Sequence, residues 1–204
     1  MAVEYGTWCF FYGIRNYNNF RFQVRATKAW RKPSFLYIKG CDFMEKMYTI
    51  ISTEWGYMAA TWTDRGLWEL DFPVQDKPSQ PDGDISSEVK FWSEQLGQEL
   101  AMYWRGFAVD FGVPIDWRGY TTFQATVLRF TASIPYGQTI TYGAVGQAIG
   151  VPKGARAVGG ALNINRVPIV IPCHRVLGAK GQLTGFAGGL EMKQALLLLE
   201  SSND

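Results

Sequence analysis

The sequence contains few of the residues that metal centres and disulfide frameworks require. Its 204 residues include one histidine, His174, and three cysteines, Cys9, Cys41 and Cys173. An odd number of widely spaced cysteines, with no Cys-x-x-Cys pair, indicates neither a disulfide framework nor a zinc knuckle. Because one imidazole supplies too few ligands for a structural zinc site, we predict no metal ion.

The sequence also lacks long apolar runs and phosphate-binding loops. No stretch approaches the roughly 20 apolar residues that cross a bilayer. Residues 1–13 have neither the basic start nor the smooth apolar run of a secretory signal. Gly143, Gly146 and Gly150 do not fit G-x-G-x-x-G, and no P-loop is present. We therefore expect an intracellular protein with no membrane partner, no nucleotide and no other cofactor.

No strong excess of charge of either sign is present, because the net charge is +2. Residues 1–46 carry eight Lys or Arg against three acids, whereas the remainder carries twelve against fifteen. The body of the protein is therefore mildly acidic. Any contact with nucleic acid must come from locally placed cations and not from a general positive field.

Alternating apolar residues and glycine-containing turns after residue 47 predict a small antiparallel sheet. Its three expected strands cover residues 48–53, 57–63 and 67–72. A helix is expected to follow, with Ser86 or Ser87 as its N-cap and apolar residues at helical spacing. We expect these residues to form a sheet-plus-helix domain over 47–118, with a hinge at residues 116–119.

The second half of the chain is expected to be mostly helical. The pattern predicts helices over 122–133, over 142–149 with Thr141 as cap and Gly150 as stop, and over 153–162 with Pro152 in the first turn. Two short helices joined by a glycine-containing turn form a helix-turn-helix unit. The predicted fold class is therefore α+β, with a helix-turn-helix domain over 119–204.

One segment combines the two residues that thiol chemistry needs. Residues 167–171 form an apolar, partly β-branched run that is typical of a strand. The run ends at Pro172 and is followed by Cys173 and His174. A thiol reacts as thiolate, and an imidazole can accept its proton. The alternative is a buried cysteine that fills a core. Adjacency does not establish a hydrogen bond, because neighbouring residues of a strand point to opposite faces.

The sequence around this pair carries a specific motif. Pro172-Cys173-His174-Arg175-Val176 resembles the active-site signature of the O6-alkylguanine-DNA alkyltransferases, also called methylated-DNA-protein-cysteine methyltransferases. The likeness runs from Phe123 to Glu200 without a gap and extends less distinctively back to about Met47. Its further elements are Ile134-Pro135-Tyr136-Gly137, Thr141-Tyr142, residues 155–161, Asn165 and residues 185–190.

The resemblance implies a direct-reversal DNA repair protein. Cys173 is then the nucleophile that takes the alkyl group from O6-alkylguanine, and each molecule acts once. Whether O4-alkylthymine is also a substrate is left open. Glu200 corresponds to the glutamate that hydrogen-bonds the histidine, and His174 acts on the cysteine through a water molecule. Asn165 matches an asparagine that supports the active-site turn, and Tyr142 donates or positions a proton for the leaving guanine.

The resemblance also implies how double-stranded DNA carrying the lesion is bound. The helix after Pro152 enters the minor groove, Arg156 takes the place of the extruded base, and Tyr142 presses on the adjacent phosphate. Lys153 lies on the same face as Arg156, and small residues such as Ala155 and Gly159 allow close approach. Taken alone, the small residues more often indicate tight helix packing.

The guanine pocket is expected to involve Val176, Phe186, Ala187 and Gly188. The implied protein is a cytoplasmic monomer, associated with the nucleoid, or a nuclear one in a eukaryote. One rival is an alkyltransferase-like protein that binds the lesion without accepting the alkyl group, although such proteins lack the cysteine. A second rival is a cysteine hydrolase that uses Cys173 and His174, which is disfavoured because its two residues normally come from remote positions.

Residues 1–46, which are aromatic and basic, have no counterpart in this pattern. They are compatible with a nucleic-acid-binding arm, because aromatic rings stack on bases and cations meet phosphates. A targeting segment is a second interpretation, although the stretch is not rich in serine. The third is translation upstream of a true start at Met44 or Met47. We favour the third, because the family pattern begins there.

Overall fold

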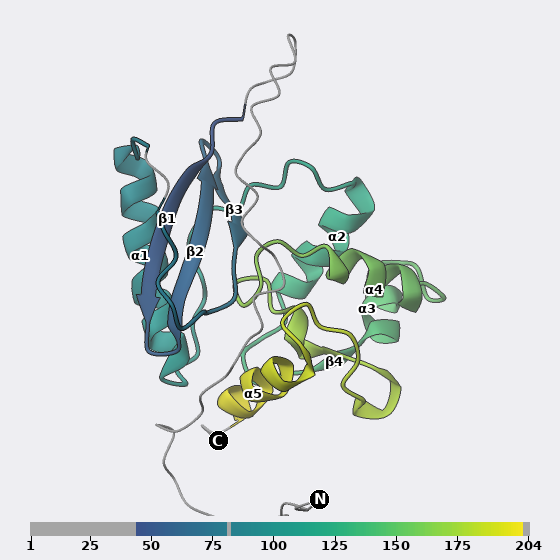
Figure 1. Ribbon diagram of the computed structural model, residues 1–204. Helices are drawn as coiled ribbons and strands as arrows, with labels where there is room; N and C mark the ends of the chain where they lie inside the picture. The colour runs from purple at the N-terminus through teal and green to yellow at the C-terminus, as the bar shows by residue number, and fades with distance from the viewer. Residues whose placement is uncertain (1–43, 81–82, 202–204) are drawn as a thin grey trace, which may run out of the picture.

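The computed structural model describes residues 44–80 and 83–201. A small antiparallel sheet with a helix along one face is followed by a group of shorter helices (Figure 1). The sheet contains β1 (Met47–Thr53), β2 (Gly56–Thr63) and β3 (Gly66–Leu70), in that order. Helix α1 (Ser87–Trp104) packs against β1 and β2.

Two glycines end the tight turns between the strands. Gly56 and Gly66 each follow a two-residue loop and have φ angles of 121° and 125°, which residues with a side chain rarely adopt. A Cβ on Gly66 would lie 2.2 Å from the carbonyl oxygen of Pro114. That oxygen accepts a hydrogen bond from the backbone N–H of Leu67 at 2.7 Å. The predicted hairpins are confirmed, with small differences at the strand ends.

Helix α1 begins at the predicted cap. The Ser86 hydroxyl oxygen accepts a hydrogen bond from the backbone N–H of Val89 at 3.2 Å, which satisfies one free donor of the first turn. Leu96, Leu100 and Tyr103 lie on its buried face and are all fully buried. Burying each leucine stabilises the fold by about 1.5–3 kcal/mol, so this face anchors the helix to the sheet.

The second half of the chain is helical, and the predicted α+β fold class is confirmed. It contains α2 (Thr122–Ala132), α3 (Tyr142–Ala148), α4 (Ala155–Asn163) and α5 (Leu190–Ser201). Strands β4 (Ile140–Thr141) and β5 (Val176–Leu177) pair in parallel. Helices α3 and α4 pack on each other and on α2 as a helix-turn-helix unit. The division into domains at residue 118 stays a prediction.

The start of α4 differs from the prediction. The helix begins at Ala155, and Pro152 and Lys153 lie in the turn before it, with Gly154 as N-cap. This turn is closed by hydrogen bonds from Val151 N–H to the carbonyl of Gly146 at 2.7 Å and from Gly154 N–H to the carbonyl of Val151 at 2.7 Å. Proline at 152 therefore stabilises the turn between α3 and α4 and not the first turn of α4.

The hypotheses for residues 1–46 fall almost wholly outside the described residues. Residues 44–46 precede β1 without regular structure, and the ammonium of the exposed Lys46 lies 4.8 Å from the centre of the Trp68 ring. Within the described part of the chain, no helix is both long and apolar enough to cross a membrane.

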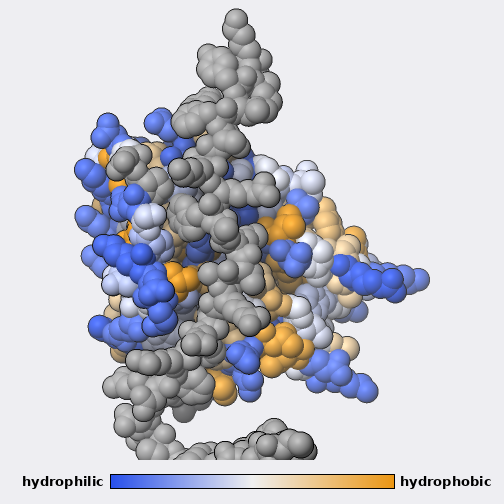
Figure 2. Space-filling view, in the orientation of Figure 1, coloured by the Kyte–Doolittle hydropathy of each residue, from blue (hydrophilic) through white to orange (hydrophobic). Residues whose placement is uncertain are grey.

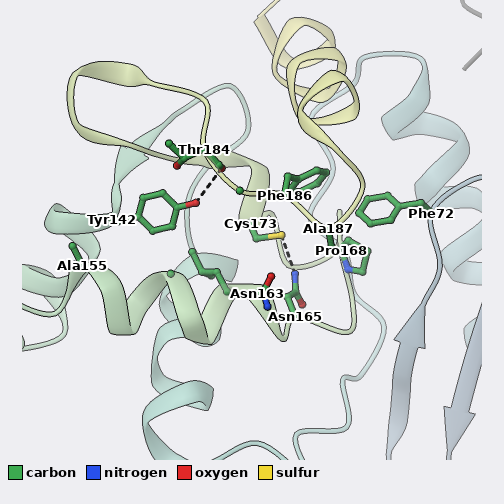
Figure 3. A pocket seen from close by; sticks show the side chains of 13 residues that line it. Phe72, Tyr142, Ala155, Asn163, Asn165, Pro168, Cys173, Thr184, Phe186 and Ala187 are labelled. Carbon is green, nitrogen blue, oxygen red and sulfur yellow. Dashed lines mark hydrogen bonds between the residues drawn. The ribbon is translucent and has the colours of Figure 1, made fainter. Parts of the chain in front are cut away.

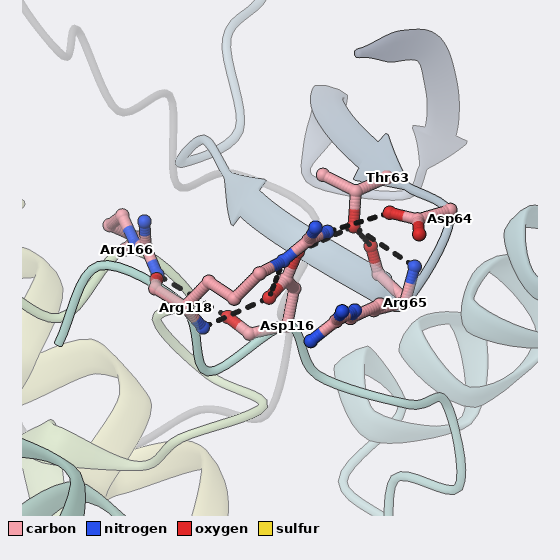
Figure 4. A network of polar contacts seen from close by, with 7 residues as sticks. Thr63, Asp64, Arg65, Asp116, Arg118 and Arg166 are labelled. Carbon is pink, nitrogen blue, oxygen red and sulfur yellow. Dashed lines mark hydrogen bonds and ion pairs between the residues drawn. The ribbon is translucent and has the colours of Figure 1, made fainter. Parts of the chain in front are cut away.

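A network of polar contacts fastens the sheet to the segment that leads into the helices (Figure 4). The buried carboxylate of Asp116 accepts hydrogen bonds from the Thr63 hydroxyl at 2.6 Å and from the Arg118 guanidinium at 2.9 Å. Burial raises the pKa of Asp116, but the hydrogen bonds from Arg118 and Thr63 outweigh it and lower the pKa to about 2. Asp116 is therefore ionised and paired at neutral pH.

Arg166 joins the same segment to the loop that carries the cysteine. Its guanidinium lies between two rings, 3.5 Å from the centre of Trp68 on β3 and 4.2 Å from that of Tyr120. It donates hydrogen bonds to the carbonyls of Asp116 and Arg118 at 3.3 and 2.8 Å. Its own carbonyl accepts a hydrogen bond from the last residue of β3 at 2.8 Å. One side chain thus connects the sheet, the linking segment and the loop.

Replacing Arg166 by alanine is expected to lower the free energy of unfolding by about 2 kcal/mol, because a partly desolvated cation–π contact and two hydrogen bonds are lost together. The matched control is Lys46→Ala, which removes an exposed cation from the same Trp68 ring. Its expected effect is below about 0.5 kcal/mol. Urea unfolding followed by tryptophan fluorescence measures both changes, and equal effects would contradict the role given to Arg166.

Candidate active site

The apolar segment 167–171 forms a buried turn and not a strand. Ile169 has a φ of 73°, in the left-handed region that β-branched residues avoid. The side-chain amide of Asn165 holds both ends of this turn. Its Oδ1 accepts a hydrogen bond from Val167 N–H at 3.0 Å, and its Nδ2 donates to the Ile171 carbonyl at 2.9 Å. The turn redirects the chain sharply just before the cysteine.

Cys173 begins the short 3-10 helix η2 (Cys173–Arg175), which follows this turn. Its thiol is free and half-buried. The sulfur accepts a hydrogen bond from Nδ2 of Asn165 at 3.3 Å. The same amide therefore holds the turn and the thiol, which is the place that the sequence predicted for Asn165.

Behind the cysteine, four groups converge on the buried carboxylate of Glu200. Its Oε1 lies 2.7 Å from Nε2 of His174 and accepts a hydrogen bond from the Tyr103 hydroxyl at 2.7 Å. Arg175 donates to both carboxylate oxygens at 2.9 and 3.0 Å, and the backbone N–H of Gly137 donates at 3.2 Å. Burial raises the pKa of Glu200, but the bonds from His174 and Arg175 lower it to about 2. The carboxylate is therefore ionised at neutral pH.

The imidazole of His174 is fully buried and uses one of its two nitrogens. Nε2 faces Glu200, whereas Nδ1 has no hydrogen-bond partner in residues 44–80 and 83–201. Within these residues no direct hydrogen bond joins the ring to the Cys173 thiol. Burial lowers the pKa of His174 and outweighs the opposing effect of Glu200. The ring is therefore neutral at pH 7, and an Nε2–H donated to the carboxylate leaves Nδ1 as an acceptor.

Lys193 places a buried cation near the thiol. Its side chain is fully buried, and its ammonium donates hydrogen bonds to the carbonyls of Val176 at 2.7 Å and Thr184 at 3.1 Å. Burial raises the pKa of Cys173, and the hydrogen bond from Asn165 and the charge of Lys193 offset part of that rise. The resting thiol is therefore protonated at neutral pH, and Lys193 is one of the groups that bring thiolate formation within reach.

A pocket of about 280 Å³ opens beside the thiol (Figure 3). Its walls come from the end of the sheet, from α3 and α4, from the turn before the cysteine and from the loop before α5. The lining residues are Phe72, Tyr142, Ala155, Gly159, Leu162, Asn163, Asn165, Pro168, Cys173, Thr184, Gly185, Phe186 and Ala187. The fold thus brings most of the predicted site residues from distant parts of the second half around one cavity.

Two predicted pocket residues do not line the cavity. The side chain of Val176 is fully buried, and only its carbonyl takes part, as the acceptor for Lys193. Gly188 packs against two residues of the wall, since a Cβ at this position would be 3.0 Å from the Phe72 ring and 3.1 Å from the Phe186 ring.

The predicted DNA-contacting cations lie on the surface outside the pocket. Arg156 is exposed on α4, and Lys153 is exposed in the turn before this helix, so the prediction that both lie on one helix face is wrong. A third cation, Lys180, was not predicted to contact DNA; it is exposed in the loop after β5 and has a φ of 63°. Figure 2 shows hydrophilic side chains projecting from the side of the molecule on which α3 and α4 lie in Figure 1.

Several residues of the site were not singled out from the sequence. Tyr103 is one of the apolar positions of α1, Phe72 follows a strand, and Lys193 stands in a leucine-rich helix, so none of them carries a local signal. Arg175 was part of the quoted motif without a role of its own. In the described part of the chain, no group of three or more His, Cys, Asp and Glu side chains is placed to hold a metal ion.

Comparison with known proteins identifies the family. A methylated-DNA–protein-cysteine methyltransferase of Methanosarcina barkeri is 39% identical over 156 residues, which cover 76% of this chain and 98% of that protein. The chain belongs to the methylated-DNA–protein-cysteine methyltransferase family. A Mycobacterium tuberculosis protein of the same name is 48% identical over 104 residues, covering 51% of this chain and 62% of that protein. The family profile described as "6-O-methylguanine DNA methyltransferase, DNA binding domain" matches residues 122–202.

Solved structures of the methyltransferase family share the fold. The structure of Mycobacterium tuberculosis OGT in complex with DNA matches with a TM-score of 0.65 at 37% identity, covering 76% of this chain and 93% of that chain. The structure of Mycobacterium tuberculosis O6-methylguanine methyltransferase matches with a TM-score of 0.61 at 34% identity, covering 78% and 95%. The likeness therefore reaches beyond residues 122–202 into the sheet-plus-helix part of this methyltransferase-family chain.

Replacing Lys193 by methionine is expected to shift the pH dependence of Cys173 alkylation to higher pH, because the lost cation no longer offsets the effect of burial on the thiol pKa. At pH 7 the alkylation rate is expected to fall several-fold, because a smaller fraction of the thiol is then ionised. Iodoacetamide labelling at a series of pH values, with the modified peptide identified by mass, measures the shift.

The matched control is Lys180→Met, which removes an exposed lysine from a nearby loop and is expected to leave the profile unchanged. A circular dichroism melt establishes whether each variant is folded. A folded Lys193→Met protein with the wild-type pH profile would contradict an electrostatic role for Lys193.

Proposed function

We propose that this protein repairs O6-alkylguanine in double-stranded DNA by moving the alkyl group irreversibly to Cys173. The observation that carries the proposal is a cysteine thiol at a pocket wall, held by Asn165, with an ionised Glu200 and a neutral His174 buried behind it. This arrangement supplies a nucleophile and a proton acceptor, together with a cavity for a base. Membership of the methyltransferase family supports the same reaction.

The chemical step is a displacement at the alkyl carbon. The thiol proton passes through a water molecule to Nδ1 of His174, and Glu200 stabilises the imidazolium that forms. The thiolate sulfur forms a bond to the alkyl carbon as the bond from that carbon to O6 breaks. The leaving guanine takes up a proton from the Tyr142 hydroxyl, which then recovers one from solvent, while His174 releases its own. The product is a thioether, so each protein molecule acts once.

The guanine has to leave the duplex before it can react. A thiolate in a pocket cannot reach O6 within the base stack, and unstacking requires a few kcal/mol that protein contacts must offset. Arg156 lies on the exposed face of α4 and is long enough to fill the space that the base leaves. Ala155 and Gly159 are small, so the backbone of α4 can approach the minor groove. Lys153 and Tyr142 flank the helix and contact the phosphates.

The proposal includes the oligomeric state of the protein and its location in the cell. A monomer that meets chromosomal DNA in the cytoplasm, or in the nucleus of a eukaryote, fits a reaction that needs no second subunit and no cofactor. The lesion-binding alternative without transfer is disfavoured because a free thiol lines the pocket. The hydrolase alternative is disfavoured because the ring of His174 makes no direct hydrogen bond to the thiol.

Incubation with excess duplex DNA containing O6-methylguanine is expected to add one methyl group per protein molecule. Intact mass and peptide mapping locate the group, which is expected on Cys173, with Cys9 and Cys41 of the same molecule as unmodified internal controls. Cys173→Ser is expected to bind the lesion without gaining mass. Unchanged mass of the wild-type protein with retained binding would favour the lesion-binding alternative.

Arg156→Ala is expected to lower the rate of methyl transfer from duplex DNA by about a hundredfold, because the unstacking energy is no longer offset. Its reaction with free O6-benzylguanine, which needs no extrusion, is expected to change less than about twofold. The matched control is Lys90→Ala, which removes one exposed positive charge from α1. Equal losses with duplex and free base would contradict a role of Arg156 in extrusion.

A further inference from the structure

One wall of the pocket comes from the sheet and not from the helical half. Phe72 follows β3 in the chain and lines the same cavity as Cys173. Its ring lies against that of Phe186 with the ring centres 5.3 Å apart and the planes at 65°, an edge-to-face contact. In Figure 3, Phe72 lies beyond Phe186, on the side of the cysteine away from Tyr142 and Ala155.

This position places Phe72 opposite the end at which a base enters. Ala155 of α4 and Tyr142 lie at the end of the pocket away from Phe72, and Gly159 of α4 also lines the cavity. This is the end next to the helix that we propose enters the minor groove. A methyl carbon occupies only the space between O6 and the sulfur of Cys173. The additional carbons of a larger alkyl group do not fit between O6 and the sulfur. They must enter the remaining space of the pocket, towards Pro168, Phe186 and Phe72.

Close contacts with Gly188 and with the sheet restrict the movement of the two aromatic rings. Gly188 packs closely against both rings, because a Cβ at this position would be 3.0 Å from Phe72 and 3.1 Å from Phe186. The residue after Phe72, Pro73, is buried. The residue before it, Asp71, donates its backbone N–H to the carbonyl of Ala59 on β2 at 2.9 Å. The sheet therefore fixes the backbone that carries the Phe72 ring.

We propose that Phe72 is a specificity-determining residue that limits the size of the alkyl group transferred to Cys173. The inference rests on the proposed function. It assigns to the sheet-plus-helix part of the chain a direct role in substrate selection. Methyl transfer needs none of the space that Phe72 fills, whereas transfer of a benzyl group competes with the ring for it. Shortening the side chain at this position thus favours transfer of a larger alkyl group relative to transfer of a methyl group.

The test compares two duplexes of identical sequence, one with O6-methylguanine and one with O6-benzylguanine, and measures the second-order rate constant of transfer from each. Phe72→Leu and Phe72→Ala are expected to raise the benzyl-to-methyl ratio of rate constants tenfold or more, since one or two carbon positions in a packed pocket are worth about that factor. Phe72→Trp is expected to lower the ratio. A general loss of stability would not change the ratio in opposite directions for smaller and larger side chains, so the three variants distinguish it from an effect of pocket volume.

The control is Phe130→Leu, which shortens a partly buried phenylalanine of α2 that does not line the pocket. Its benzyl-to-methyl ratio is expected to match that of the wild type. An unchanged ratio in all three Phe72 variants, or a proportional loss of both rates, would overturn the specificity role. Failure of the wild-type protein to accept any methyl group would overturn the proposed function itself, and the inference with it.

Discussion

A single buried carboxylate determines how the parts of this protein meet. Glu200 near the end of α5 accepts hydrogen bonds from Tyr103 on α1, from Arg175 on the cysteine loop and from the backbone of Gly137, and it lies beside His174. A buried charge without partners is strongly unfavourable, so these segments have to assemble together around it. The same contacts fix the imidazole, and the fold and the position of the His174 ring therefore depend on one group.

In the turn before the cysteine, an unfavourable backbone conformation is retained because it orients a functional group. A left-handed β-branched residue is unfavourable by about 1–3 kcal/mol and persists only where its surroundings fix it. Ile169 is held by burial of its side chain and by the amide of Asn165, which binds both ends of the turn and the sulfur. An unstrained strand over 167–171 would carry Cys173 away from that amide.

The sequence predicted those features that depend on neighbouring residues. Ser86 and Thr141 act as caps, and the cysteine motif is read from adjacent letters. The missed features arise from tertiary structure: Tyr103 and Glu200 are 97 residues apart, and Phe72 reaches the pocket only because β3 ends beside it. The predicted start of α4 was wrong by two residues, because a proline is compatible with a connecting turn as well as with the first turn of a helix.

The environment of the thiol explains why a single-use nucleophile can remain intact until a lesion arrives. Burial raises the pKa of Cys173 and lowers that of His174, so proton transfer between them is unfavourable in the free protein. Both groups stay neutral, and a neutral thiol reacts slowly with stray electrophiles. In the proposed reaction a bound alkylguanine changes this balance, because sulfur–carbon bond formation consumes the thiolate as it forms. The hydrogen bond from Asn165 and the charge of Lys193 offset part of the rise in the Cys173 pKa. The shifted pKa values of Cys173 and His174 thus keep the resting protein unreactive and favour reaction with a substrate that fills the pocket.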